Sequence, residues 1–137
     1  MSRIVMIGGH GKVALLAAPL LVDAGHEVVS LIRNPDHSAD VAATGDTPLV
    51  LSVEEADVAE LTRVFAGADA IVWSAGAGGK GGPERTDAVD RAAAIRSMEA
   101  AAAAGVTRYV MVSFLTAYGE VPDDHPLRAY AIAKIAA

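Results

Sequence analysis

The sequence contains no cysteine, few aromatic residues and fewer basic than acidic side chains. Without cysteine, disulfide bonds, thiolate catalysis and cysteine-based metal sites are excluded. Aromatic residues make up 4% of the chain, which argues against a surface on which nucleic-acid bases stack. The 11 Lys and Arg residues against 17 Asp and Glu residues give a net charge of −6, whereas a phosphate backbone selects for positive charge. We therefore expect no nucleic-acid partner.

Long apolar runs are also missing. The N-terminal run Ile4–Ile7 is followed by glycines, whereas a signal peptide needs an apolar stretch of about 7–15 residues. The longest uncharged apolar run, Val13–Val22, contains Pro19 and is shorter than the roughly 18 residues that a membrane span needs. These features lead us to expect a cytoplasmic protein without membrane contact. The length of 137 residues, with 53% hydrophobic and 20% charged residues, predicts one folded domain over residues 1–137.

Short β-rich runs alternate with helical runs along the chain. This alternation predicts a parallel sheet with helices on both faces. Pro19 inside the first helical run predicts a kink or an early end of that helix. Ser52 and Glu55 have the spacing of a capping box, which predicts that a helix begins there. The expected strands are 4–7, 27–32, 48–51, 70–73 and 108–112, and the expected helices are 12–24, 36–44, one from 52 onward, 84–104 and 128–137.

The first β-rich run ends in a glycine-rich turn. A turn of this kind leaves room for a pyrophosphate at the helix N-terminus, where free N–H groups and the helix dipole stabilise the anion. The alternative is an ordinary turn between a strand and a helix. The strand before it and the helix after it favour a dinucleotide site in a Rossmann-type, doubly wound α/β fold, with about five parallel strands in the order 3-2-1-4-5 and three layers. The turn consists of Gly8, Gly9, His10, Gly11, Lys12, Val13 and Ala14.

The end of the second expected strand bears on which cofactor binds. NAD sites place Asp or Glu there, about 20 residues beyond the glycines, to hold the ribose 2′-hydroxyl. Here Ile32 stands at that position and Arg33 follows it. A guanidinium pairs well with a 2′-phosphate, so the sequence favours NADP, with NAD as the alternative. Arg33 as a solvated charge at the end of a strand is the other interpretation.

Five segments of the chain, taken in order, resemble the short-chain dehydrogenase/reductase superfamily, and in particular its atypical NAD(P)H-binding, epimerase/dehydratase-like branch. The resemblance covers nearly the whole chain. It implies that residues after the third and fourth strands also contact the cofactor, namely Ser52, Val53, Ser74, Ala75 and Gly76. Relatives often carry Asp where this sequence has Ser52. The matching segments are 7–14, 31–35, 72–83, 108–113 and 130–134.

The resemblance also implies a catalytic set. Tyr130 and Lys134 match the family's YxxxK pair, Ser113 matches the serine that binds the substrate oxygen, and Asp90 lies where the family often has Asn. The spacing of Tyr130 and Lys134 puts both side chains on one helix face. We expect the ammonium and the cofactor's positive ring to lower the pKa of the phenol from about 10. The alternatives are that Tyr130 packs in the core, Lys134 is solvated and Ser113 caps a strand.

The chain ends three residues after Lys134, where members of this superfamily continue. We therefore expect a C-terminally shortened member that lacks most substrate-binding residues. The fifth strand is then a sheet edge, and unpaired edges promote association, so self-association into a homo-oligomer is expected there.

Two classes of function remain. The first is an NADP-dependent oxidoreductase or epimerase/dehydratase-like enzyme that transfers hydride to or from a small carbonyl or hydroxyl substrate. The second is a non-catalytic module that binds or senses NADP(H), or an inactive Rossmann fragment.

Overall fold

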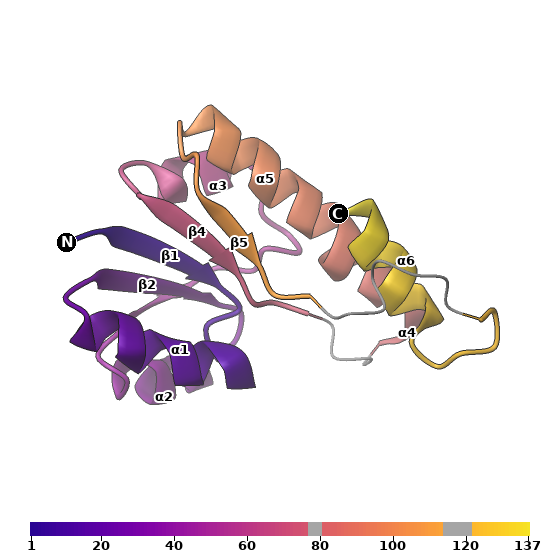
Figure 1. Ribbon diagram of the computed structural model, residues 1–137, viewed down its shortest axis with the longest axis horizontal. Coiled ribbons are helices and arrows are strands. Elements are labelled where there is room, and N and C mark those ends of the chain that lie inside the picture. Colours follow the sequence, from indigo (N-terminus) through magenta and orange to yellow (C-terminus); the bar gives the residue numbers. More distant parts are fainter. Residues whose placement is uncertain (77–80, 114–121) are drawn as a thin grey trace.

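Five strands pair side by side in one parallel sheet (Figure 1). The computed structural model describes residues 1–76, 81–113 and 122–137. The order β3-β2-β1-β4-β5 confirms the predicted Rossmann-type topology. The strands are β1 (Arg3–Ile7), β2 (Glu27–Ile32), β3 (Thr47–Val50), β4 (Ala70–Trp73) and β5 (Tyr109–Met111).

The central strands are largely apolar because helices cover both faces of the sheet. In β1, Ile4–Ile7 are all buried. Ile7 stands opposite Leu31 of β2 and Trp73 of β4, so these three strands end at the same level. Their carboxyl ends therefore form one edge, on which the loops that follow them meet.

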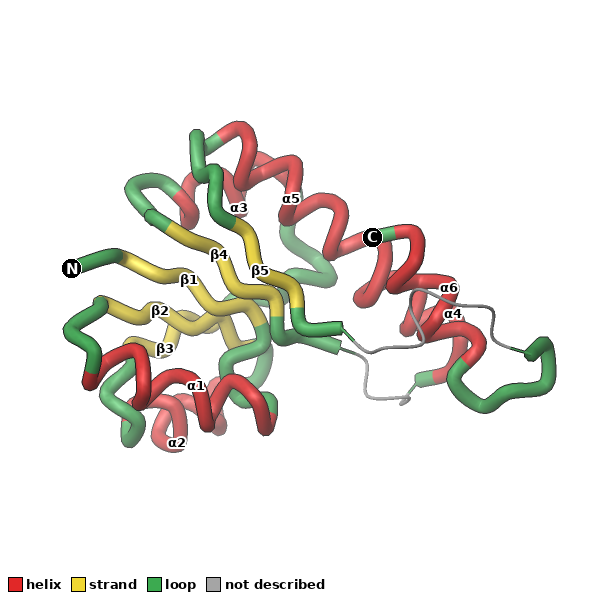
Figure 2. The backbone as a smooth tube through the Cα atoms, in the orientation of Figure 1, coloured by secondary structure: helices red, strands yellow, loops and turns green. Residues whose placement is uncertain are grey.

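Helices lie on both sides of this sheet (Figures 1 and 2). The helices α1 (Lys12–Asp23) and α2 (Ser38–Ala42) cover one face, and α3 (Val58–Phe65) and α5 (Ala94–Ala103) cover the other. The larger core cluster lies on the α3 and α5 side and includes Phe65 and Trp73. The helix α4 (Gly82–Thr86), the π-helical segment η2 (Asp87–Ala93) and α6 (Arg128–Ala136) pack on one another and extend beyond the carboxyl ends of the strands.

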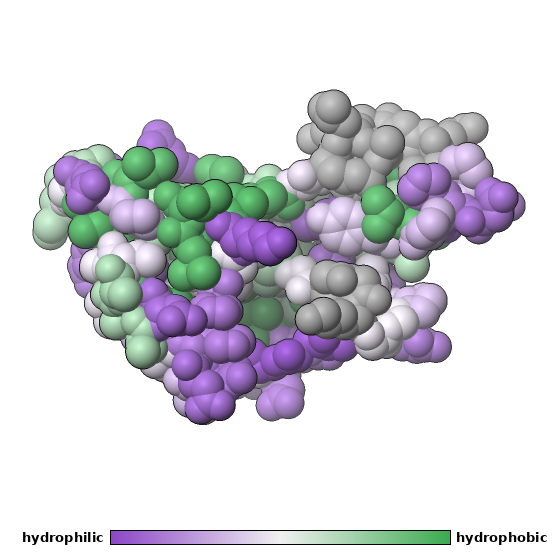
Figure 3. Space-filling model, turned by 90° about the horizontal axis from the view of Figure 1, so that it is seen from below, coloured by the Kyte–Doolittle hydropathy of each residue, from purple (hydrophilic) through white to green (hydrophobic). Residues whose placement is uncertain are grey.

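Helix α1 packs on the sheet through small residues. Ala14 and Ala18 are buried, and Ala14 packs with Met6 and Val28, so the helix lies close to the strands. Its outer face carries the exposed side chains of Val13, Leu16 and Leu20. The view from below in Figure 3 shows apolar side chains gathered on the side of the molecule on which α1 lies.

Three helix boundaries differ from the sequence-based expectation. The predicted capping box at Ser52 is wrong: α3 begins at Val58, and the side chain of Asp57 accepts from the Glu60 backbone N–H at 2.8 Å. Pro19 was expected to kink the first helix or to end it early; α1 does not end there but continues to Asp23. The long helix expected over 84–104 begins at Gly82 and widens into the π-helical turn η2.

Both β3 and β5 are edge strands among the described residues. Val110 of β5 is half exposed. Self-association through this edge stays a prediction. Within the described ranges, none of the helices combines the length and apolarity that crossing a bilayer requires.

The Tyr109 hydroxyl joins β5 to α5 and is expected to make the fold sensitive to alkali. Tyr109 Oη lies 2.6 Å from Ser97 Oγ, and burial raises the pKa of Tyr109 to about 12 while this hydrogen bond partly opposes the rise. An unfolded chain loses the same proton near pH 10, so stability is lost as the pH rises from there through the folded pKa. We expect this group to remove about 2 kcal/mol of unfolding free energy between pH 10 and pH 12.

Urea unfolding at pH 9 and pH 11.5 measures this effect. The Tyr109→Phe variant should lose less stability than the wild type over this interval, because phenylalanine has no proton to release. Equal losses in the two proteins would contradict the assignment.

Candidate functional site

Two cavities lie side by side at the carboxyl ends of the strands, where open α/β sheets bind their ligands. The segment after β4, Ser74, Ala75 and Gly76, lines both of them. The first cavity, of about 440 Å³, also borders Gly8, His10 and Gly11 of the glycine turn. The second cavity, of about 450 Å³, also borders Tyr130. Volumes of this size are typical of small-molecule sites.

The glycine turn is folded tightly against its neighbours. The backbone N–H groups of Gly8 and Gly9 both donate to the carbonyl oxygen of Leu31, at 3.1 and 3.0 Å. Gly8 has a φ of +80°, and a Cβ there would lie 2.5 Å from the Cα of Ala75. A Cβ on Gly9 would lie 2.2 Å from the Cβ of Ser30. These contacts leave space only for glycine at both positions.

Below this turn lies a buried polar pair that sequence analysis missed. The Ser30 hydroxyl donates to Asp46 Oδ2, and both residues are buried. Burial raises the pKa of Asp46, and the hydrogen bond from Ser30 opposes that rise. Because Ser30 also contacts Gly9, this pair supports the turn from below. The contact joins residues 16 positions apart, so no local motif marks it.

The N-terminus of α1 fits a pyrophosphate. Helix α1 has no acidic residue in its first turn, and its first N–H groups have no partner within the helix. Gly11, which precedes the helix, lines the first cavity, whereas Lys12 and Val13 line the second. Negative charge is therefore favoured where the two cavities meet the helix.

His10 forms part of a small cluster with α2. Its Nε2 lies 2.9 Å from Asp40 Oδ2, and its ring stacks on that of His37 at a centroid distance of 3.6 Å. Both imidazoles line the first cavity. Sequence analysis singled out His10, but it did not predict its partners His37 and Asp40.

The first cavity also contains the residues expected to hold the adenosine half of a cofactor. Arg33, Ser52 and Val53, which follow β2 and β3, all line it. Their contact with a cofactor stays a prediction. Glu54 and Arg85 line the same cavity and were not among the predicted site residues.

The second cavity is bordered by Tyr130, the tyrosine of the expected Tyr–Lys pair. Tyr130 lines the cavity, and Lys134 Nζ lies 5.6 Å from its ring centroid. Lys134 is 6% exposed and donates a hydrogen bond to the carbonyl oxygen of Val112 at 3.1 Å. Asp90, in η2, is fully buried and acts electrostatically on both Tyr130 and Lys134. The fold thus brings Asp90, Tyr130 and Lys134 together.

In the chain alone, the pKa of Tyr130 lies above its ordinary value. Burial raises it, and the negative charge of Asp90 raises it further. Burial also lowers the pKa of Lys134, and the negative charge of Asp90 opposes this shift. In the chain alone, Tyr130 is therefore protonated at neutral pH. The lowering expected with the cofactor's positive ring beside the phenol stays a prediction.

Ser113 is placed less favourably than the other candidates. It is exposed just after β5, and it is not among the described residues that line either cavity. Its neighbour Val112 does line the second cavity.

Comparison with known proteins gives one family and several longer relatives. A family model described as NAD(P)H-binding matches residues 8–137. The UPF0659 protein C216.03 of Schizosaccharomyces pombe is 40% identical over 115 residues, which cover 82% of this chain and 47% of that protein. The uncharacterized sugar epimerase YhfK of Bacillus subtilis is 32% identical over 133 residues, which cover 96% of this chain and 62% of that protein. The chain thus spans about half to three fifths of these relatives.

Solved structures show the same architecture. A putative NAD-dependent epimerase/dehydratase from Bacillus halodurans superposes with a TM-score of 0.88 at 29% identity, covering 99% of this chain and 62% of that one. The Bordetella bronchiseptica enzyme WbmG in complex with NAD and UDP superposes with a TM-score of 0.78 at 24% identity, covering 98% of this chain and 47% of that one. The second likeness concerns the fold alone.

Proposed function

The chain belongs to the NAD(P)H-binding family, and from that premise we propose that it binds NADP in the two adjoining cavities and serves hydride transfer to or from a small carbonyl or hydroxyl substrate. The observation that carries this proposal is the glycine turn, in which a Cβ on Gly8 would collide with Ala75, after β4, and a Cβ on Gly9 with Ser30 of β2. That turn keeps the α1 N-terminus open to a pyrophosphate. The names of the Bacillus subtilis and Bacillus halodurans relatives support an epimerase- or dehydratase-like reaction.

The residues present suit each part of a dinucleotide. Gly11 and the α1 N-terminus would hold the pyrophosphate, and Arg33 the 2′-phosphate of NADP. Ser52 and Val53 would border the adenosine half, and Ser74, Ala75 and Gly76 the centre.

When bound, the nicotinamide ring supplies or removes a hydride. The chain's own part is to place the substrate oxygen and to move a proton. Because Asp90 and burial raise the pKa of Tyr130, its phenol carries a proton at neutral pH and is suited to donate it to a carbonyl oxygen. Lys134, held by the Val112 carbonyl, positions this end of α6 against β5. Ser113 would contact the substrate from the end of β5.

A non-catalytic module that binds NADP(H) is the second candidate. The exposed position of Ser113, outside the described lining of the second cavity, favours it. Both candidates share the cofactor site and differ in whether the Tyr130 hydroxyl matters for turnover.

Calorimetric titration with NADPH and with NADH tests the shared cofactor site. We expect NADPH to bind more tightly, and Arg33→Ala to weaken it by about 10- to 100-fold with little effect on NADH, because hydrogen bonds to charged groups contribute about 1.5–3 kcal/mol. Arg63→Ala, at an exposed position on α3, is the matched control for the loss of one positive charge. Equal loss for both cofactors would contradict the role of Arg33, and absence of binding by the folded wild type would contradict the proposed function.

A further inference from the structure

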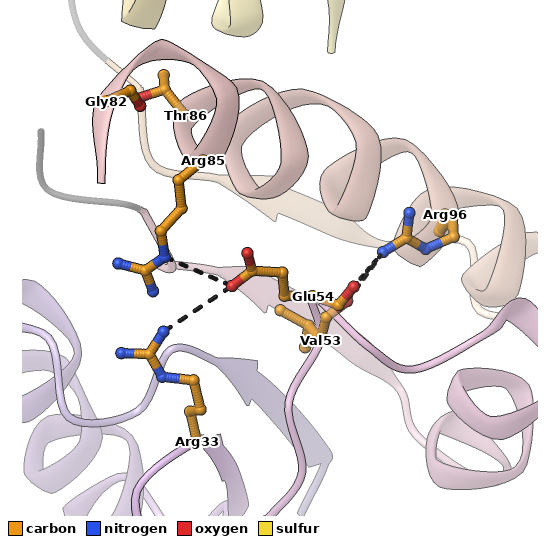
Figure 4. Close-up of polar contacts among 7 residues, drawn as sticks. All are labelled: Arg33, Val53, Glu54, Gly82, Arg85, Thr86 and Arg96. Atoms are coloured by element: carbon orange, nitrogen blue, oxygen red, sulfur yellow. Dashed lines mark hydrogen bonds and ion pairs between the residues drawn. The ribbon is translucent and has the colours of Figure 1, made fainter. Parts of the chain in front are cut away.

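A carboxylate lies between two guanidinium groups in the first cavity (Figure 4). Glu54 Oε2 is 3.8 Å from Arg33 Nη1 and 3.5 Å from Arg85 Nε. The three residues come from three parts of the fold: the end of β2, the turn after β3, and α4. Figure 4 shows both guanidinium groups directed at the same carboxylate.

The backbone at Glu54 is held in place by a residue of α5. Arg96 Nη2, on α5, donates to the carbonyl oxygens of Val53 and Glu54, at 3.2 and 3.0 Å. Arg33, in contrast, has a side chain that is 61% exposed. The anion is therefore anchored to the fold, whereas one of its two cations is free to reorient toward a ligand.

The two ion pairs are weak enough to be exchanged for better ones. Each is longer than a hydrogen bond, they share one carboxylate oxygen, and water screens ion pairs at partly exposed sites. A phosphate monoester carries about −1.5 to −2 charges and three acceptor oxygens, so it pairs with two arginines at once. Glu54 therefore neutralises part of the positive charge that would attract such a group and also repels it.

We propose that Glu54 is a specificity-determining residue of the cofactor site: its carboxylate competes with the 2′-phosphate of NADP for Arg33 and Arg85, and so limits the preference for NADP over NAD. This inference rests on the proposed function. Arg85, which lies 52 positions beyond Arg33 in the sequence, is the second cation of the same phosphate subsite. NADH, which lacks the 2′-phosphate, leaves the Glu54 pairs in place.

The test is calorimetric titration of the wild type and Glu54→Gln with NADPH and with NADH. Glu54→Gln should bind NADPH roughly five- to tenfold more tightly and NADH about equally, since it removes the competing charge and keeps the side-chain size. NADPH affinity should also fall more steeply with added salt in this variant. Glu55→Gln, the exposed neighbour, is the matched control for a change of one charge and should leave the ratio of the two affinities unchanged.

Arg85→Gln supplies an independent test, because it breaks the same pair by removing a cation. It should weaken NADPH binding about tenfold and leave NADH binding unchanged. This result keeps the inference testable if Glu54→Gln loses its fold, which circular dichroism would show.

Four results would overturn the inference. Weaker NADH binding by Glu54→Gln would mean that the carboxylate holds the ribose hydroxyls instead. Equal gains for both cofactors, or equal effects of Glu54→Gln and Glu55→Gln, would reduce the effect to overall charge. If neither cofactor binds to the folded wild type, the proposed function itself fails and the inference fails with it.

Discussion

Replacing Gly8 with alanine is expected to destabilise the protein by about 2–5 kcal/mol and to abolish dinucleotide binding. Two costs add. The φ of +80° places an alanine in the left-handed region, at about 1–2 kcal/mol, and its Cβ would meet the Ala75 backbone at 2.5 Å, which forces the segment after β4 to move. Urea unfolding measures the first effect and calorimetric titration with NADPH the second.

The matched control for Gly8→Ala is Gly11→Ala. Gly11 has a φ of −64°, and its added Cβ would lie 3.3 Å from the Gly8 carbonyl oxygen, a contact that small adjustments relieve. We expect a stability loss of about 1 kcal/mol or less with weaker cofactor binding, because the methyl group enters the first cavity. If both variants lost the same stability, the two glycines would have the same role and the described turn would be wrong.

Replacing Tyr130 with phenylalanine is expected to lower turnover by about 10²- to 10⁴-fold while the affinity for NADPH stays within about twofold. The phenol is the proton donor that we propose for the second cavity, and its loss leaves the ring and its packing in place. The measurement is the rate of NADPH oxidation with a panel of small aldehydes and ketones. Tyr109→Phe removes a phenol that lines neither cavity and should keep wild-type turnover.

The two functional candidates diverge in this experiment. A Tyr130→Phe protein that turns over like the wild type would contradict the role of the phenol as a proton donor. A wild type that binds NADPH but oxidises it with no member of the panel would favour the non-catalytic module.

The strands could be predicted closely from the sequence, because buried parallel strands appear as short, continuous apolar runs. The ranges 27–32 and 70–73 were predicted to the residue. The start of α3 was not, because Ser52 and Asp57 both have Glu three positions later. The difference between these two possible helix starts comes from a tertiary contact. Arg96, more than 40 positions away, donates hydrogen bonds to the carbonyl oxygens of residues 53 and 54 and so holds this segment in a turn.

The site residues, too, could be predicted where they form local patterns and not where they depend on contacts between distant segments. The glycine turn and the Tyr130–Lys134 spacing are local patterns, and the fold places both beside a cavity. The Glu54–Arg85 contact and the Ser30–Asp46 pair join distant segments, so no spacing rule could find them. The direction of the Tyr130 pKa shift depended on burial and on Asp90, which only the packing of η2 against α6 determines.

The segment Ser74–Gly76 is a wall common to both cavities, and this has a thermodynamic consequence. A ligand that shifts or stiffens this wall from one side changes the free energy of binding on the other side. Such coupling is reciprocal, so a compound in the Tyr130 cavity alters the affinity for the adenosine half by the same factor as the reverse. In the proposed binding mode, the whole dinucleotide fills both cavities, whereas an adenosine fragment fills one. The difference between their binding free energies would then include this coupling in addition to the contacts that the rest of the dinucleotide makes.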